Sequence, residues 1–186
     1  GMPMRLRDAN GVAAQVPLGN SMPDFHAGWS SNISYKKFGA YALLDGAFGR
    51  KMWNEGYHWA LGDFMSGTVD QAGKSVENAK PIGYYWRAPS PENAAGVGGF
   101  YDVLGPNTKS YEDASYMKLR EVSLSYNVGT LPRLPGNWSI TAIGRNLYTW
   151  TKFTGWDPDQ GGVVSSSQSS SYPQIRNFTL TLGSKF

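Results

Sequence analysis

The stretch RNFTLTLGSKF, residues 176–186, alternates between apolar and polar side chains. Its even positions include Phe178, Leu180, Leu182 and Phe186, whereas its odd positions are small, polar or charged. Successive side chains of a β-strand point to opposite faces of the sheet, so this pattern predicts a strand with one apolar face and one polar face.

Four further segments show the same alternation, at residues 25–35, 38–48, 116–128 and 138–150. A length of about 11 residues is what a tilted strand needs to cross the hydrocarbon layer of a membrane. The phase of the alternation changes inside the third segment, which predicts a β-bulge near Arg120–Glu121. We therefore expect five antiparallel strands with a bulge in the middle one.

The connections between these segments alternate between short and long. Lys36–Lys37 predicts a tight hairpin, and GTLPRLPGN forms a second short connection. Transmembrane barrels have this rhythm, with short periplasmic turns and long extracellular loops. We expect residues 1–24 to be an extracellular loop leading into the barrel and residues 25–186 to be the C-terminal part of that barrel. Its long loops would be residues 49–115 and 151–173.

Aromatic residues occur near both ends of every predicted strand. Two aromatic girdles that flank an apolar band are typical of a barrel wall. The predicted girdle residues are Phe25, Tyr35, Phe38, Phe48, Tyr116, Tyr126, Trp138, Trp150, Phe178 and Phe186. Five strands cannot close a barrel, because the smallest bacterial ones have about eight. The predicted fold is therefore all-β, an antiparallel transmembrane β-barrel segment that forms the C-terminal wall of a larger plugged barrel.

The composition excludes several other classes of protein. There is no apolar run near the ~18 residues that a membrane-spanning helix needs, so a helical membrane protein is excluded. The chain has no Cys, which excludes disulfides and thiolate metal sites. Its 17 basic residues are scattered rather than gathered into a stripe, so we expect no nucleic-acid partner.

Several blocks of the sequence resemble the SusC/RagA family of TonB-dependent outer-membrane transporters. These are LGNSMPDFHAGWSSNISYKKFGAYALLDGAFG (18–49), EDASYMKLREVSLSY (112–126), GRNLYTWTKFTGWDPD (144–159) and YPQIRNFTLTLGSKF (172–186). They occur in the order that the family shows and cover most of the chain. The resemblance implies a location in the bacterial outer membrane and contact with outer-membrane lipid.

The resemblance also implies a function and a set of partners. The full protein would be a barrel of about 22 strands around a plug. It would import oligosaccharides or peptides together with a SusD-like surface lipoprotein, driven by the TonB complex of the inner membrane. The last strand resembles the signal that the barrel-assembly machinery recognises, with Phe178, Leu180, Leu182 and Phe186 as the residues recognised. No enzymatic activity is expected.

One departure from the family pattern concerns metal binding. The family often carries an acidic loop before the first of these blocks, and here only Asp8 and Asn10 of it remain. Hard cations need several oxygen ligands, so we predict neither a metal nor another cofactor.

The sequence shows no catalytic constellation. His26 and His58 lack the spacing of a metalloprotease motif. The acidic pairs Glu112–Asp113 and Asp157/Asp159 could be compared with the two carboxylates of a glycosidase. We expect them instead to be solvated loop carboxylates.

Other side chains are candidates for contacts inside the barrel or in its loops. Arg145 and Arg120 are expected on the inward face, where an Arg fork could pair with a carboxylate of the plug. The first long loop should contain a short helix within KMWNEGYHWALGDF, and its aromatic residues could pack on the loop, hold a partner or stack on substrate. The candidates for substrate or partner contact are Trp53, Trp59, Tyr84, Tyr85 and Trp86.

Two alternative functions stay open at this point. The chain could be a soluble or secreted β-sheet module that binds glycans through surface aromatics. It could also be a complete small porin, which would require additional strands within residues 49–115.

Overall fold

The computed structural model describes most of the chain, and its main element is one five-stranded antiparallel sheet. The described residues are 6–63, 65–67, 70–80, 108–160, 165–168 and 172–186. The strands are β1 (Phe25–Tyr35), β2 (Phe38–Phe48), β5 (Tyr116–Leu131), β6 (Leu134–Thr151) and β8 (Asn177–Lys185), and they lie side by side in that order. The five predicted strands and the antiparallel fold are confirmed.

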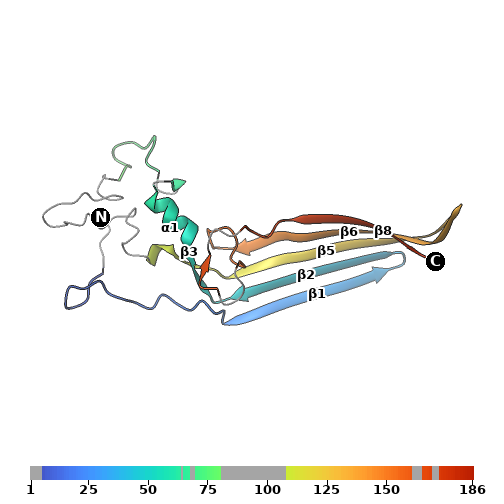
Figure 1. Cartoon of the computed structure of the whole chain (residues 1–186), viewed down its shortest axis with the longest axis horizontal. Helices are drawn as coiled ribbons and strands as arrows, with labels where there is room; N and C mark the ends of the chain where they lie inside the picture. The colour runs from blue at the N-terminus through green and yellow to red at the C-terminus, as the bar shows by residue number, and fades with distance from the viewer. Residues whose placement is uncertain (1–5, 64, 68–69, 81–107, 161–164, 169–171) are drawn as a thin grey trace.

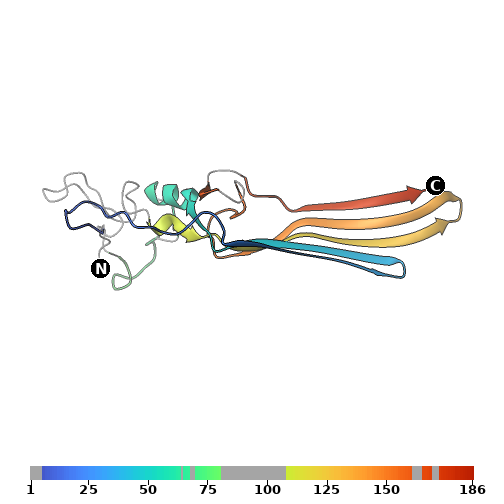
Figure 2. The same ribbon diagram turned by 90° about the horizontal axis from the view of Figure 1, so that it is seen from below.

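The sheet is long and gently curved, and the connections gather at its two ends (Figures 1 and 2). The two tight hairpins, β1–β2 and β5–β6, lie at one end together with the C-terminus. The described parts of the long connections and of the segment before β1 lie at the other end. We refer to these as the hairpin end and the loop end of the sheet.

The loop end carries a small second layer of structure. It consists of β3 (Lys51–Asn54), α1 (Glu55–Gly62), the 3-10 turn η2 (Thr108–Ser110), β4 (Tyr111–Asp113) and β7 (Ser167–Gln168), with β4, β3 and β7 forming a three-stranded sheet. Asn54 caps α1, because its side-chain oxygen accepts a hydrogen bond from the backbone N–H of Tyr57 at 3.0 Å. The predicted short helix is confirmed.

The second short connection differs from the prediction in its length. Strands β5 and β6 continue past the predicted ends at Val128 and Trp138 until Leu131 pairs with Leu134. Pro132 and Arg133 alone make the turn, with Arg133 in the left-handed region at φ 73°. The two glycines and two prolines here interrupt the apolar alternation and shift the register of the pairing, but β5 and β6 remain neighbours and extend beyond the rest of the sheet (Figure 2).

The predicted bulge is confirmed, and it determines which side chains share a face. Against β6 the register passes from Leu119 directly to Glu121, and Arg120 has no partner in β2 either. This extra residue lets Lys118 and Arg120 lie on the same polar face as Glu121. Before the bulge the even-numbered residues of β5 face the polar side of the sheet, and after it the odd-numbered residues do.

Neither face of the sheet is covered by an apolar layer among the described residues. The buried apolar side chains are few and are located mostly at the loop end: Ala47, Met52, Leu61, Ala114, Tyr116 and Phe153. The chain exposes 12669 Å², whereas a compact monomer of 20.4 kDa exposes about 8,800 Å². No helix in the described part of the chain is long and apolar enough to cross a membrane. The sheet therefore needs other surroundings to bury its apolar face.

Candidate functional site: the apolar face and the charged cluster

The first candidate surface is the apolar face of the sheet. Alternate residues of the strands face this side, and the large apolar side chains among them are exposed to solvent in the isolated chain. They include Phe25, Trp29, Ile33, Tyr35, Phe38, Leu124, Tyr126, Ile140, Phe178, Leu180 and Leu182. Isolated soluble proteins rarely expose a continuous apolar surface of this extent, so this face is suited to contact with lipid.

Aromatic rings meet in pairs at both ends of this face. At the loop end Phe25 stacks on Phe48 with ring centroids 5.0 Å apart, and at the hairpin end Phe38 meets Tyr126 at 4.7 Å. The placement of one girdle residue is wrong: the Tyr116 side chain is only 3% exposed and lies on the polar face. The reason is the bulge, which reverses the phase of alternation along β5. The girdle role of the other residues stays a prediction.

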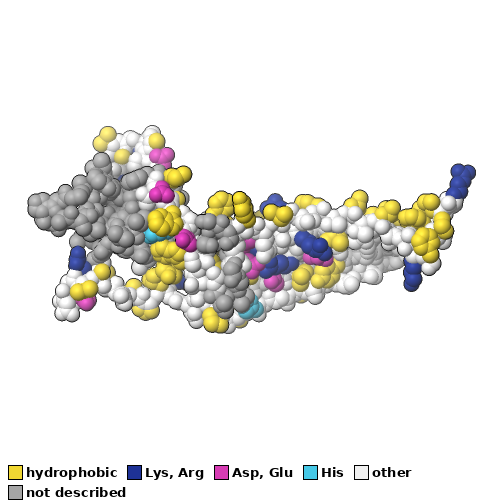
Figure 3. Space-filling view, viewed as in Figure 1, with side chains coloured by type: hydrophobic (Ala, Val, Ile, Leu, Met, Phe, Trp, Pro, Cys, Tyr) yellow, Lys and Arg dark blue, Asp and Glu magenta, His cyan; other side chains and the backbone are white. Residues whose placement is uncertain are grey.

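The second candidate surface is a charged cluster on the polar face near the loop end. Lys118 Nζ lies 2.7 Å from Asp157 Oδ1 and 3.3 Å from Asp159 Oδ2. Arg120 bridges two carboxylates, with Nη1 at 2.6 Å from Asp159 Oδ2 and Nη2 at 3.0 Å from Asp45 Oδ2. Figure 3 shows basic and acidic side chains mixed on this part of the sheet.

The cluster holds a loop against the sheet. Asp157 and Asp159 belong to the connection between β6 and β8, whereas Lys118 and Arg120 belong to β5. Tyr116 adds to the attachment by donating its hydroxyl hydrogen bond to Asp159 Oδ1 at 2.7 Å. The segment after β6 is therefore folded back over the polar face.

The prediction that these acids are solvated loop carboxylates is wrong for Glu112, Asp157 and Asp159, whereas Asp113 is exposed. Asp157 is 6% exposed, because the loop folds its carboxylate into the cluster beneath it. Glu112 is likewise engaged, since it accepts hydrogen bonds from the backbone N–H of Thr154 at 2.7 Å and from the side-chain amide of Asn54 at 2.9 Å. The first and second long loops are thus joined to each other.

The electrostatics of the cluster favour ionised carboxylates. Burial would raise the pKa of Asp159, but hydrogen bonds from Arg120 and Tyr116 and the charge of Lys118 outweigh it, so this pKa is lowered. Arg50 is also buried, and burial lowers its pKa. Its Nη2 donates to the carbonyl of Ser165 at 2.7 Å, while Nε and Nη1 have no hydrogen-bond partner within the described ranges.

We expect acid to loosen this attachment through Asp159. A carboxyl group whose pKa is lowered on folding contributes stability above its unfolded pKa of about 3.9, and that stability is lost as the pH falls through the lower folded value. Pepsin should therefore cleave residues 152–160 of the full-length protein faster at pH 2 than at pH 4. Asp159→Asn should lose most of this difference, and an undiminished difference in that variant would contradict the assignment.

The two arginines proposed for plug contact already have carboxylate partners in this chain. Arg120 is bound to Asp45 and Asp159, and Arg145 Nε lies 2.7 Å from Glu121 Oε2 in the neighbouring strand. The side chain of Arg145 is 52% exposed against 20% for Arg120, so Arg145 is the more accessible of the two. Contact with a plug stays a prediction for both.

The aromatic residues of the loops fall into a packed group and an exposed group. Trp53 packs on His58 and Tyr111, with ring centroids 4.6 Å and 5.2 Å apart. Trp59 is 53% exposed and Trp156, which the sequence analysis did not select, is 70% exposed. Tyr84, Tyr85 and Trp86 lie outside the described residues.

Trp156 and α1 bring the two loops together. Its indole nitrogen lies against Gly56 of α1. The GWDP segment has no periodic pattern that could have marked this tryptophan.

Among the described residues, the histidine of α1 shows no sign of a metal site. Burial lowers the pKa of His58, which is next to Trp59 in the sequence. Within the described ranges no three His, Cys, Asp or Glu side chains are grouped so as to hold a metal ion.

Comparison with known proteins agrees with this architecture. The chain is 25% identical to "TonB-dependent receptor P3" and 27% identical to "TonB-dependent receptor P26", both from Formosa agariphila, over 96% and 92% of its length. The chain is similar to the TonB-dependent receptors of the bacterial outer membrane. It spans 18% of the length of each of these relatives. No family model matches it.

Solved structures show the same fold. The chain superposes on the structure of the RagAB peptide importer in the open-open state with a TM-score of 0.59, at 20% identity, covering 95% of this chain and 18% of that one. The closed-closed state gives a TM-score of 0.58 at 20% identity, covering 95% and 20%. The predicted resemblance to a barrel segment of a TonB-dependent transporter is confirmed, and so is the outer-membrane location that it implies.

Proposed function

We propose that this chain is the C-terminal part of the barrel of a TonB-dependent importer, with its apolar face in the outer-membrane lipid and its polar face toward the lumen. The observation that carries the proposal is the five-stranded sheet with one uncovered apolar face and one polar face. The wall of a transmembrane barrel requires an apolar face toward the lipid and a polar face toward the lumen. The two edge strands, β1 and β8, would pair with strands elsewhere in the full barrel.

The cargo that we propose is a peptide or an oligosaccharide. The solved structures with this fold include the RagAB peptide importer, which favours peptides as the first class to test. Trp59 and Trp156 are exposed at the loop end, where rings can stack on sugars or on apolar peptide side chains. Residues 49–115 and 151–173 would be the extracellular loops, and residues 1–24 would lead into the barrel from that side.

The proposed partners act on different parts of the full protein. A SusD-like lipoprotein would contact the loop end, and the TonB complex would act through a plug outside this segment. The barrel-assembly machinery would recognise the last strand, where Phe178, Leu180, Leu182 and Phe186 are all exposed. The proposed role is transport, so no residue is assigned a catalytic function.

An uptake assay tests the proposal. A strain lacking the full-length gene should accumulate a fluorescently labelled peptide or oligosaccharide mixture less than the wild type, and a plasmid copy should restore the accumulation. A protonophore should abolish the restored uptake, because TonB-dependent import draws on the inner-membrane proton gradient. Equal uptake in all strains, for both cargo classes, would contradict the proposal.

The two alternative functions have less support. A soluble glycan-binding module would have to cover the apolar face of its sheet, and no described element does so. A complete small porin would need further spanning strands in residues 49–115. The only strands in the described part of that range are β3 and β4, of 4 and 3 residues, which are too short to cross a membrane.

A further inference from the structure

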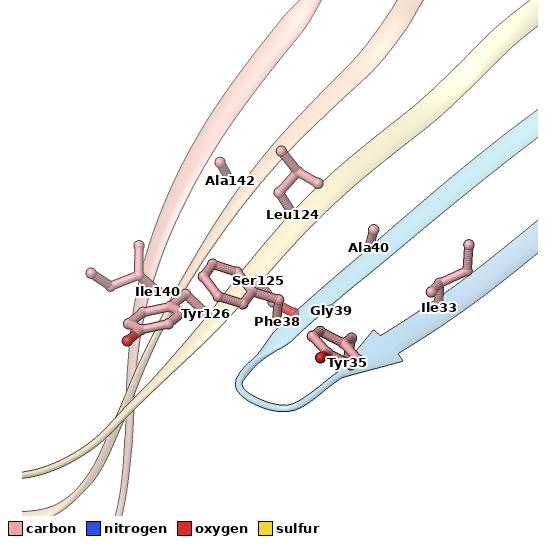
Figure 4. A pocket seen from close by; sticks show the side chains of 10 residues that line it. All are labelled: Ile33, Tyr35, Phe38, Gly39, Ala40, Leu124, Ser125, Tyr126, Ile140 and Ala142. Carbon is pink, nitrogen blue, oxygen red and sulfur yellow. The ribbon is translucent and has the colours of Figure 1, made fainter.

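A shallow groove crosses the apolar face of the sheet at the hairpin end. Its volume is about 310 Å³, within the ~300–1,000 Å³ of ordinary small-ligand sites. Ile33 and Leu124 flank the small side chain of Ala40, which leaves the groove open, and Tyr35, Phe38, Tyr126 and Ile140 stand at the end nearest the turn (Figure 4). All lining residues belong to β1, β2, β5 and β6, so the groove is complete within this chain.

The charge around the groove is one-sided. The register places Ser31, Ala42, Val122, Gly144 and Phe178 in one row across the sheet. Between this row and the turns the chain contains no Asp or Glu, whereas its basic residues there are Lys36, Lys37, Arg133 and Lys185. Figure 3 shows this separation on the face in view, because the basic side chains at the hairpin end have no acidic ones beside them.

The groove and the basic charge meet at the β1–β2 turn. Lys36 Nζ lies 5.2 Å from the centroid of the Tyr35 ring, which itself lines the groove. Lys37 follows in the same turn, and its carbonyl accepts a hydrogen bond from the N–H of Asn127 at 2.8 Å, which ties the turn to β5. The ring of Phe38 is held by Tyr126. The apolar groove therefore ends at the turn that carries Lys36, whose ammonium lies over the Tyr35 ring.

We infer that the hairpin end of the sheet binds one anionic glycerophospholipid, with an acyl chain in the groove and its phosphate beside Lys36 and Lys37. An acyl chain matches the apolar lining, and a phosphate matches the charge that no acidic residue offsets. Tyrosine hydroxyls at this depth suit the polar interface of a membrane. The inference rests on the proposed function, since that function places the hairpins in the inner leaflet of the outer membrane.

Native mass spectrometry of the full-length protein in detergent tests the inference. The delipidated protein is titrated with dioleoyl phosphatidylglycerol or with dioleoyl phosphatidylcholine, and the lipid-bound fraction is measured. We expect phosphatidylglycerol to be retained about tenfold better, since each lysine near an anionic group contributes a factor of about five at most. Equal retention of the two lipids would overturn the inference.

Two variants separate the headgroup from the chain. The double variant Lys36→Gln/Lys37→Gln should lose the preference for phosphatidylglycerol, while the control Lys74→Gln, an exposed loop lysine, should keep it. Ala40→Phe fills the groove with an apolar ring and should reduce retention of both lipids. Retained preference in the double variant, or undiminished binding in Ala40→Phe, would overturn the assignment.

Folding and transport are measured separately from lipid binding. A shift in gel mobility on heating shows that each variant is a folded barrel before its lipid is measured. Because lipid retention is measured without cargo, a wild-type protein that imports but shows no preference for phosphatidylglycerol would reject this inference alone. Absence of import in a protein that still prefers phosphatidylglycerol would reject the proposed function alone.

Discussion

Lys118→Ala should detach the segment after β6 from the polar face of the sheet, at a cost of about 3–5 kcal/mol. Lys118 and Asp157 are 2% and 7% exposed in their side chains, so the pair is buried. Removing the ammonium would leave the Asp157 carboxylate in a poorly solvated site without its partner at 2.7 Å. The cost comes mainly from that uncompensated charge.

Hydrogen exchange in the full-length protein measures this effect. Amides of residues 153–160 should exchange much faster in Lys118→Ala than in the wild type, while those at the hairpin end should be unchanged. Lys152→Ala, at an exposed lysine of the same loop, is the matched control and should change little.

A double variant distinguishes the ion pair from simple packing. Lys118→Met/Asp157→Leu removes both charges and keeps apolar volume, so it should restore much of the protection. If the single and the double variant were equally unprotected, or if Lys118→Ala exchanged at the wild-type rate, the buried ion pair would not be what holds the loop.

Leu124→Arg should reduce insertion of the full-length barrel, with a loss of about 1–3 kcal/mol. Leu124 is 60% exposed on the apolar face and pairs with Ala40 and Ala142, which are too small to shield it. An arginine there would face hydrocarbon, one row of side chains in from Tyr35, Phe38 and Tyr126. The physical cost is the desolvation of its guanidinium.

Ser123→Arg is the matched control for this change. Ser123 precedes Leu124 in β5 and points to the polar face, where an arginine can be solvated in the lumen. The amount of heat-modifiable protein in the outer-membrane fraction should fall for Leu124→Arg and stay close to wild type for Ser123→Arg. A reduction that is equal for both variants would contradict the assignment of the two faces.

The strands could be predicted from the sequence because their signal is local. Residues 25–35 and 38–48 have the bounds of β1 and β2 because apolar side chains recur at every second position along one face of each and a two-residue turn joins them. The bulge at Arg120 was also visible, since the apolar phase changes within one strand. Tyr116 was misplaced because the aromatic residue at a strand end was assigned to the girdle without applying that change of phase.

The charged cluster could not be predicted, because its members are far apart in the chain. Asp157 and Asp159 lie 39 and 41 residues from Lys118, in a segment without the apolar periodicity of a strand or helix. Their burial depends on how the loop crosses the sheet, which no local pattern encodes. The contacts of Trp156 with α1 have the same origin.

The sequence by itself determined the strands, their two faces and the resemblance to an outer-membrane barrel, since a period of two residues and short motifs are properties of consecutive residues. Only the tertiary structure decided which loop carboxylates are buried, which arginines are already paired, and that the apolar groove ends beside Lys36. Burial and charge pairing arise from tertiary contacts between segments that are distant in the sequence. The order of residues within any one strand does not specify those contacts.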